Sequence, residues 1–330
     1  MNHLIEVENL KKYYSGRHFL GGKPHTVHAV DDVSFSVRQG ETLGVVGESG
    51  CGKTTIARAI LRLIEPTSGK IKYQGFDISG YDKEAMRQIR KELQIIFQDP
   101  YASLNPRMTV LEQIQAPLDV FRIGSLAQRR DSAAKIMEKV GLSQEFCNRY
   151  PHEFSGGQRQ RIGIARTLVL NPKFVICDEP VSALDVSVRS QTLNLMIDLQ
   201  KEYSLTYLFI SHDLSVVRYI CDRVMVLYLG KIMEIAPRES LYNNPRHPYS
   251  AALLASIPIP DVDTKRKRAV LSGDVPSAFD PPSGCRFHTR CDRVQPICRD
   301  KEPELRQAAN DHFVACHLEK NPEKTLPLPR

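Results

Sequence analysis

The hydrophobic positions of this chain follow two periods. Apolar and polar residues alternate in residues 4–8 and 28–37, which predicts half-buried antiparallel strands. Short continuous apolar runs predict four further strands, at residues 42–46, 93–97, 173–177 and 205–210. Between these runs, residues 109–149 have mostly helical spacing and residues 187–203 form a predicted amphipathic helix. Strands that alternate with helices in this way predict an α/β fold with a parallel sheet.

A glycine-rich segment lies between the run at 42–46 and a predicted helix, which a turn at residues 65–69 is expected to end. Residues 47–54 read Gly-Glu-Ser-Gly-Cys-Gly-Lys-Thr, and a strand before and a helix after are the context that a G-x-x-x-x-G-K-[ST] motif requires. Glycine lets the backbone N–H groups converge on one anion, and the helix N-terminus adds its positive dipole. Lys53 would then contact the β and γ phosphates, and the Thr54 hydroxyl would bind Mg²⁺. The alternative is a glycine turn with an exposed lysine.

Composition narrows the class of protein. The 330 residues are 42% apolar and 25% charged, as in soluble globular proteins, with room for one large core and a smaller one. No stretch approaches 18 apolar residues, and the first residues lack a signal-peptide pattern, so we expect no membrane span and no export by that route. The net charge of +7 suits anionic headgroups but does not indicate nucleic acid.

Two further motifs carry chemistry. The strand at 173–177 ends at Asp178 and Glu179; the first carboxylate is placed to hold Mg²⁺, and the second could accept a proton from an attacking water. This pair alone could equally be a solvated strand end. Ser155 is a good helix N-cap, and Gly156 and Gly157 would leave N–H groups bare at that helix N-terminus. The alternative there is an ordinary capped helix.

The segment from residue 4 to about residue 235 resembles the ATP-binding-cassette (ABC) ATPases, with its motifs in the same order along the chain as in that family. Residues 154–158, Phe-Ser-Gly-Gly-Gln, are similar to the family signature LSGGQ, and residues 182–185, Ser-Ala-Leu-Asp, match the D-loop. By this resemblance Tyr14 (or Tyr13) stacks on adenine, Gln98 is the Q-loop glutamine and His212 is the switch histidine. The resemblance implies an ATP and Mg²⁺ site made of Tyr14, Gly47, Glu48, Ser49, Gly50, Cys51, Gly52, Lys53, Thr54, Thr55, Gln98, Ser155, Gly156, Gly157, Gln158, Asp178, Asp185 and His212.

The resemblance also implies a fold and a mechanism. The fold is an α/β P-loop NTPase of the ABC type, with a RecA-like parallel core, an antiparallel β-subdomain and a helical subdomain. Two ATP molecules would be sandwiched in a head-to-tail dimer, each between the P-loop of one subunit and the signature of the other. Glu179, His212, Gln98 and Lys53 are the expected catalytic residues, with Thr54, Gln98 and Asp178 around Mg²⁺.

Two local segments point to one branch of this family. Residues 98–107 and 244–249 resemble those of oligopeptide and dipeptide importer ATPases, in which a cysteine-containing extension follows the cassette. The expected organisation is a cassette at 1–255, with its helical subdomain at about 99–165, and an extension at 256–330. The resemblance implies a peripheral subunit at the cytoplasmic face of the cell membrane. Its expected partners are two permease subunits, a second ATPase and a solute-binding protein.

Other functions remain open at this point. Nickel or an oligosaccharide could replace the peptide, since relatives of this type are associated with both. A soluble cassette ATPase acting on DNA or ribosomes usually carries two cassettes or a long coiled coil, and one P-loop and no sustained heptads are present here. An exporter with fused membrane helices would need membrane spans, and the absence of any long apolar stretch excludes it.

The extension holds four of the eight cysteines, namely Cys285, Cys291, Cys298 and Cys316. Thiolates suit zinc or iron–sulfur clusters. Structural zinc commonly uses C-x₂₋₄-C pairs, and none is present, whereas wider spacing suits a 4Fe-4S cluster, as does the resemblance. Zinc and ordinary packing are the alternatives. The other four cysteines, Cys51, Cys147, Cys177 and Cys221, are expected to be packing residues, and the basic run at 265–268 a solvated linker or a contact with anionic lipid.

Overall fold

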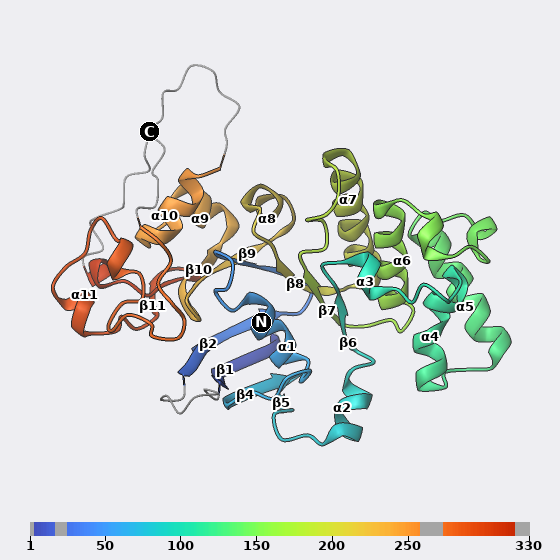
Figure 1. Cartoon of the computed structure of the whole chain (residues 1–330), viewed down its shortest axis with the longest axis horizontal. Coiled ribbons are helices and arrows are strands. Elements are labelled where there is room, and N and C mark those ends of the chain that lie inside the picture. The colour runs from blue at the N-terminus through green and yellow to red at the C-terminus, as the bar shows by residue number, and fades with distance from the viewer. Residues whose placement is uncertain (1–2, 17–24, 258–272, 321–330) are drawn as a thin grey trace, which may run out of the picture.

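Two β-sheets form the centre of the molecule (Figure 1). The computed structural model describes residues 3–16, 25–257 and 273–320. The smaller sheet is antiparallel with strand order β2-β1-β4-β5, built from β1 (His3–Gly16), β2 (His25–Arg38), β4 (Ser68–Tyr73) and β5 (Phe76–Asp77). It contains both stretches whose alternation predicted antiparallel strands. That prediction is confirmed.

The larger sheet is mixed and has the order β11-β12-β10-β9-β3-β8-β7-β6. Its parallel part consists of β9 (Arg223–Tyr228), β3 (Thr42–Val46), β8 (Thr206–Ile210), β7 (Phe174–Asp178) and β6 (Leu93–Ile96). All four apolar runs of the sequence are therefore strands of this part. The antiparallel part consists of β10 (Lys231–Pro237), β12 (His312–Val314) and β11 (Arg306–Ala309).

Both faces of the parallel part are covered, which explains why its strands are apolar without alternation. In β7, Val175 and Cys177 pack into one hydrophobic cluster and Phe174 and Ile176 into another. The second cluster also contains α1 (Lys53–Ile60) and the small sheet, and the first contains α6 (Gly156–Leu168), α7 (Val186–Tyr203) and α8 (Leu214–Ile220). The P-loop therefore lies between a fully buried strand and a buried helix.

A group of helices occupies one end of the molecule (Figure 1). It consists of α3 (Pro100–Ser103), α4 (Val110–Phe121), α5 (Leu126–Lys139) and α6, with short 3₁₀ turns at 144–146 and 151–153. The predicted helical insertion is thus present, although its bounds of 99–165 stay a prediction. The remaining helices are α2 (Lys83–Ile89), α9 (Arg238–Asn243), α10 (Pro248–Ala255) and α11 (Ile297–Asp300).

One helix ends earlier than the sequence predicts. The helix after the P-loop does not continue to the turn at 65–69, because α1 stops at Ile60. Arg62 takes a left-handed conformation, φ +51°, and the Leu63 and Arg62 N–H groups donate to the carbonyls of Arg58 and Ala59. This pair of bonds is the Schellman pattern, usually closed by glycine. Because an arginine takes the glycine position here, the sequence carries no visible signal for this helix end.

The extension is continuous with the cassette sheet. Its hairpin of β11 and β12 pairs antiparallel with β10, and Phe287 and Cys298 belong to the same hydrophobic cluster as the cassette helices. The basic run at 265–268 lies outside the described residues. In the part of the chain that the structure describes, no helix is both long and apolar enough to cross a bilayer.

Candidate functional site

The P-loop is closely packed against its surroundings. Gly47 and Gly52 have φ of +152° and +106°, and a Cβ on either would lie 2.2 Å from a backbone oxygen, that of Leu227 or of Ala29. These two positions therefore require glycine. The buried Lys53 ammonium donates to the carbonyls of Gly47 at 2.7 Å and Glu48 at 3.0 Å. The Lys53 side chain therefore spans the loop, and its ammonium lies beside the N–H groups that are predicted to bind phosphate.

Two of the three predicted Mg²⁺ ligands, Thr54 after the loop and Asp178 at the end of β7, are in contact. The Thr54 hydroxyl donates to the Asp178 carboxylate at 3.1 Å. Asp178 is 6% exposed, and this burial raises the pKa of its carboxyl, although the Thr54 hydrogen bond and the positive charges of Arg58 and Lys53 oppose the shift. A hydroxyl and a carboxylate at the end of a strand are the oxygen donors that Mg²⁺ prefers, so these residues fit the ion.

Two other predicted residues, Gln98 and His212, converge on Glu179. Its carboxylate accepts a hydrogen bond from Gln98 Nε2 at 2.9 Å and lies 3.1 Å from His212 Nδ1. Glu179 has φ +49°, and its N–H donates to the Ile210 carbonyl. A left-handed non-glycine residue costs about 1–3 kcal/mol and is often found at functional sites. The carboxylate thus has a fixed direction, as a base that orients water needs.

The two adjacent tyrosines differ in their surroundings. The Tyr13 hydroxyl donates to the Asp31 carboxylate at 2.5 Å. Tyr14 is 41% exposed, with the Lys12 ammonium 4.9 Å from its ring centre. An aromatic face that can stack on a base must be accessible, so the structure favours Tyr14 over Tyr13 for the predicted adenine contact.

The signature segment begins α6, and the D-loop leads into α7. The Ser155 hydroxyl accepts from the Gln158 N–H, and the Gln158 side chain accepts from the Ser155 N–H, which forms a capping box. Phe154 is buried in the core, whereas Ser155 and Gly156 are exposed. Asp185, the N-cap of α7, is exposed and makes no side-chain cap bond.

The N-terminus of α6 does not lie at this chain's own P-loop. Figure 1 places α6 in the helical group, apart from α1, which follows the P-loop. The chain therefore brings together the P-loop, Asp178, Glu179, Gln98 and His212, but leaves the signature separate. A nucleotide contacted by both needs the signature of another subunit.

Two residues that sequence reasoning missed contact the P-loop from distant parts of the chain. Arg290 forms an ion pair with Glu48, and the Tyr249 hydroxyl accepts the Glu48 N–H. These partners are 242 and 201 residues away along the chain. No local pattern relates residues at such separations, so only the fold could reveal the contacts.

The four late cysteines line one small pocket, together with His247, His288 and His317. Burial raises the pKa of Cys316 to about 12 and that of Cys285 to about 11, and neighbouring cysteines of the cluster add to both shifts. Among the described residues, no group of three or more His, Cys, Asp or Glu side chains has the arrangement of a metal site. The fold therefore gathers the predicted thiols, but a metal centre stays a prediction.

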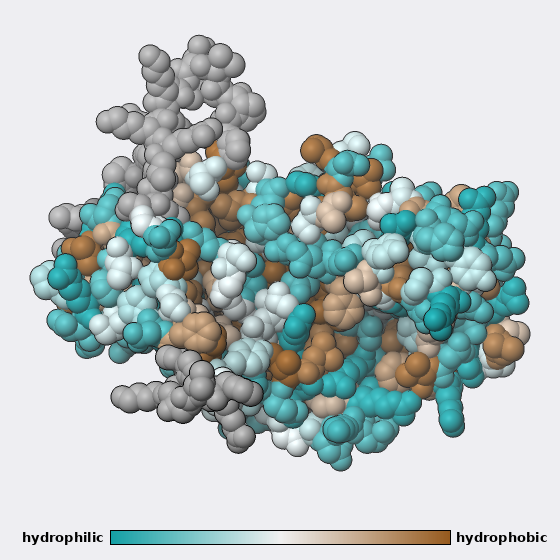
Figure 2. Space-filling view, viewed as in Figure 1, coloured by the Kyte–Doolittle hydropathy of each residue, from teal (hydrophilic) through white to brown (hydrophobic). Residues whose placement is uncertain are grey.

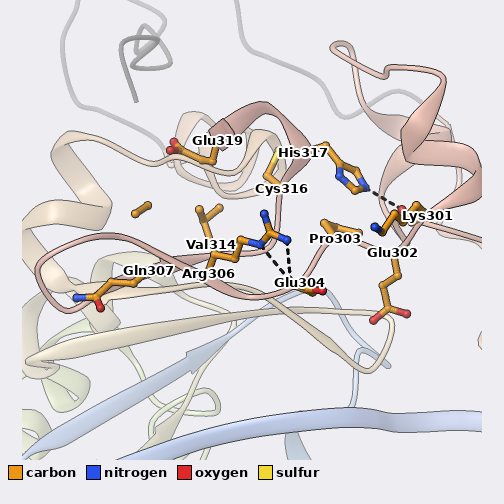
Figure 3. Close-up of a pocket in the computed structure, with 11 residues that line it drawn as sticks. Lys301, Glu302, Pro303, Glu304, Arg306, Gln307, Val314, Cys316, His317 and Glu319 are labelled. Carbon is orange, nitrogen blue, oxygen red and sulfur yellow. Dashed lines mark hydrogen bonds and ion pairs between the residues drawn. The ribbon is translucent and has the colours of Figure 1, made fainter. Parts of the chain in front are cut away.

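A second pocket, of about 120 Å³, lies beside this cluster in the extension (Figure 3). Arg306 pairs with Glu304 there, and His317 contacts the Lys301 carbonyl. Charges of both signs line it, and none of the predicted nucleotide-binding residues does. It does not contribute to the P-loop site.

Comparisons with known proteins identify the family of the chain. Residues 30–182 match the family model "ABC transporter", and residues 233–298 match "Oligopeptide/dipeptide transporter, C-terminal region". The chain is 54% identical to the oligopeptide transport ATP-binding protein AppF of Bacillus subtilis, over 96% of this chain and 97% of the relative. It is 53% identical to the putative peptide import ATP-binding protein BOV_A0347 of Brucella ovis, over 95% and 97%.

A solved structure extends the comparison to the fold. The dimeric ATP-binding cassette MJ0796, in a post-hydrolysis state bound to ADP and Pi, superposes with a TM-score of 0.64 at 29% identity. The superposition covers 71% of this chain and 98% of the cassette. The predicted cassette fold is thereby confirmed. With its near full-length relatives and both family matches, the chain belongs to the ABC transporter family, among the oligopeptide and dipeptide transport ATP-binding proteins.

Proposed function

We propose that this chain is the ATP-hydrolysing motor subunit of an importer for dipeptides or oligopeptides. The observation that carries the proposal is the convergence of Gln98, His212 and Glu179 beside the Thr54–Asp178 pair, in a chain whose C-terminal region matches that of peptide transporters. A motor subunit does not contact the solute, so its residues do not identify the solute. Nickel or an oligosaccharide is therefore the alternative to a peptide.

Each residue of the site has a proposed role in hydrolysis. Lys53 and the P-loop N–H groups bind the phosphates, and Thr54, Gln98 and Asp178 surround Mg²⁺, which neutralises charge on the phosphates. Glu179 orients and deprotonates the attacking water, and His212 contacts the γ-phosphate. Tyr14 stacks on adenine. Ser155, Gly156, Gly157, Gln158 and Asp185 act on the nucleotide of the neighbouring subunit, because they lie away from their own P-loop.

The proposed partners follow from the incomplete site and from the helical group. A second, similar ATPase supplies the missing signature. Two permease subunits form the path through the membrane, and the ATPases bind them at its cytoplasmic face. A solute-binding protein delivers the peptide. The helical group carries exposed apolar side chains, among them Tyr101 at 61% and Leu126 at 68%. In Figure 2 these helices are mostly hydrophilic, with apolar side chains in small separate patches. Small separate patches of this kind are ordinary on protein surfaces, so the proposed permease contact rests on the position of this group directly after Gln98.

Peptide uptake tests this function. A strain that lacks this chain should lose most uptake of a labelled tripeptide, and expression of the chain should restore it. Uptake of labelled nickel and of a labelled oligosaccharide serves as the matched comparison. Tagged chain purified from the same membranes should carry two permease subunits and a second ATPase. Normal tripeptide uptake in the deletion strain, with lost uptake of another solute, would contradict the peptide assignment.

We also propose that Cys285, Cys291, Cys298 and Cys316 hold a 4Fe-4S cluster, with zinc as the alternative. Supporting this, the four thiols line one pocket, and the other three add to the burial that raises the pKa of Cys316. The buried side chains of the extension, such as Phe287, belong to a cluster shared with the cassette helices, and a metal centre would stabilise the extension within itself. Because burial raises the pKa of Cys285 and Cys316, metal binding must displace protons from these two thiols.

Anaerobic purification tests the cluster. The protein should be brown and contain about four iron and about four sulfide per chain. Cys298→Ser should lower both contents, whereas Cys147→Ser, which changes a cysteine outside this pocket, should not. Colourless protein with one zinc per chain would decide for zinc, and protein without either metal would leave the thiols as packing residues.

A further inference from the structure

Glu48, the second residue of the P-loop, is held by a side chain of the extension. Arg290 Nη1 donates to one carboxylate oxygen at 2.7 Å, and Nη2 donates to the other at 3.2 Å. This two-point contact is the geometry in which arginine binds carboxylates most strongly. The Arg290 side chain is 6% exposed and that of Glu48 24%, so the pair is largely shielded from water and from salt.

The backbone of Glu48 is also fixed. Its N–H donates to the Tyr249 hydroxyl at 3.0 Å, and its carbonyl accepts from Lys53. All three polar groups of Glu48 therefore have partners, two of them from the region that matches the peptide-transporter family model. The loop residue is therefore restrained by two residues of this C-terminal region.

Arg290 itself is anchored by buried aromatic rings. It lies in the 3₁₀ turn 288–290, and its N–H donates to the carbonyl of Phe287, which is 2% exposed. Phe287 packs against Tyr228 and Tyr249 with ring centres 5.3 Å and 5.2 Å apart, and the Arg290 guanidinium lies 5.9 Å from the Tyr228 ring. These contacts leave the guanidinium little freedom, so it holds Glu48 in one position.

The charge of Glu48 gives this contact a consequence for nucleotide binding. A carboxylate in a loop that binds a triphosphate repels the ligand unless a cation neutralises it. Of the described side chains, Arg290 is the one whose ion pair with Glu48 the structure records. Removing Arg290 would leave the Glu48 carboxylate as an unpaired negative charge on the loop that is proposed to bind the nucleotide phosphates.

We infer that Arg290 is a positioning residue of the nucleotide site, which acts through Glu48 by fixing the P-loop and cancelling its carboxylate charge. The inference rests on the proposed role of the P-loop and goes beyond it, because it makes the C-terminal extension part of the ATP site. It explains why an extension so far along the chain packs against residue 48.

Titration of the full chain with a fluorescent ATP analogue and Mg²⁺ tests the inference. Arg290→Ala should weaken binding about tenfold, because the repulsion of an unpaired carboxylate is of that order. Arg290→Ala combined with Glu48→Gln should recover most of the loss, since neither charge then remains. Raising the salt from about 0.05 M to about 0.5 M should also reduce the deficit of Arg290→Ala, because salt screens the repulsion.

Control variants separate this effect from loss of structure. Arg299→Ala removes an equal charge from the exposed surface of α11 and should bind the analogue normally. If Arg290→Ala does not fold, Arg290→Gln gives the same comparison. Binding by Arg290→Ala at the wild-type level, or a double variant as weak as the single one at every salt concentration, would overturn the inference. Lys53→Ala serves as the site control, because normal binding there would instead contradict the P-loop assignment.

Discussion

Glu179→Gln is expected to bind MgATP but to hydrolyse it at least about 100-fold more slowly than the wild type, since positioned general bases contribute about 10²–10⁴-fold. Glutamine keeps the size of the side chain and its contact with Gln98 and His212, but it cannot accept a proton from water. Phosphate release by the chain assembled with its transporter subunits measures this loss, and nucleotide binding should persist.

The specific role of Glu179 needs a matched control. Glu84→Gln changes an exposed glutamate of α2, which pairs with Arg87, and should leave hydrolysis unchanged. A Glu179→Gln complex with wild-type phosphate release would remove this residue from the role of the base. Glutamine and glutamate differ little in backbone preference, so we expect a difference in rate to report the carboxylate.

Lys53→Ala is expected to lose MgATP binding by about 100-fold, because a charge-assisted contact with the phosphates disappears. The Lys53 ammonium bonds to the carbonyls of Gly47 and Glu48, so its loss also frees the loop. A titration with a fluorescent ATP analogue measures the change. Lys83→Ala, at an exposed position that begins α2, should bind normally. Equal affinity of Lys53→Ala and wild type would exclude the proposed phosphate contact.

Local sequence patterns led to the P-loop and the Asp178–Glu179 pair, because strand, loop and helix follow one another within a few residues, and the family resemblance added Gln98 and His212. Residues 42–60 contain the buried strand β3, the glycine turn and α1 in direct succession. Gln98, Glu179 and His212 each come directly or closely after a strand of the parallel sheet. Since parallel strands end at the same edge, their side chains meet there without any long-range signal in the sequence.

Contacts between distant segments could not be predicted in this way. The pairing of β12 with β10 and the Arg290–Glu48 ion pair depend on how the extension folds back. The early end of α1 was hidden because Arg62 takes the position usually occupied by glycine. The choice between Tyr13 and Tyr14 likewise needed Asp31, which binds the Tyr13 hydroxyl from the neighbouring strand.

In the proposed mechanism, the P-loop of one subunit and the signature of another subunit close on the same nucleotide. A structure of the assembled complex carrying Glu179→Gln with bound MgATP tests it most directly. We expect ATP to lie between the P-loop of one ATPase subunit and residues 155–158, or their counterpart, of the other. The substituted side chain at position 179 should face the γ-phosphate. A complex with ATP on the P-loop and the opposite signature facing solvent would contradict it.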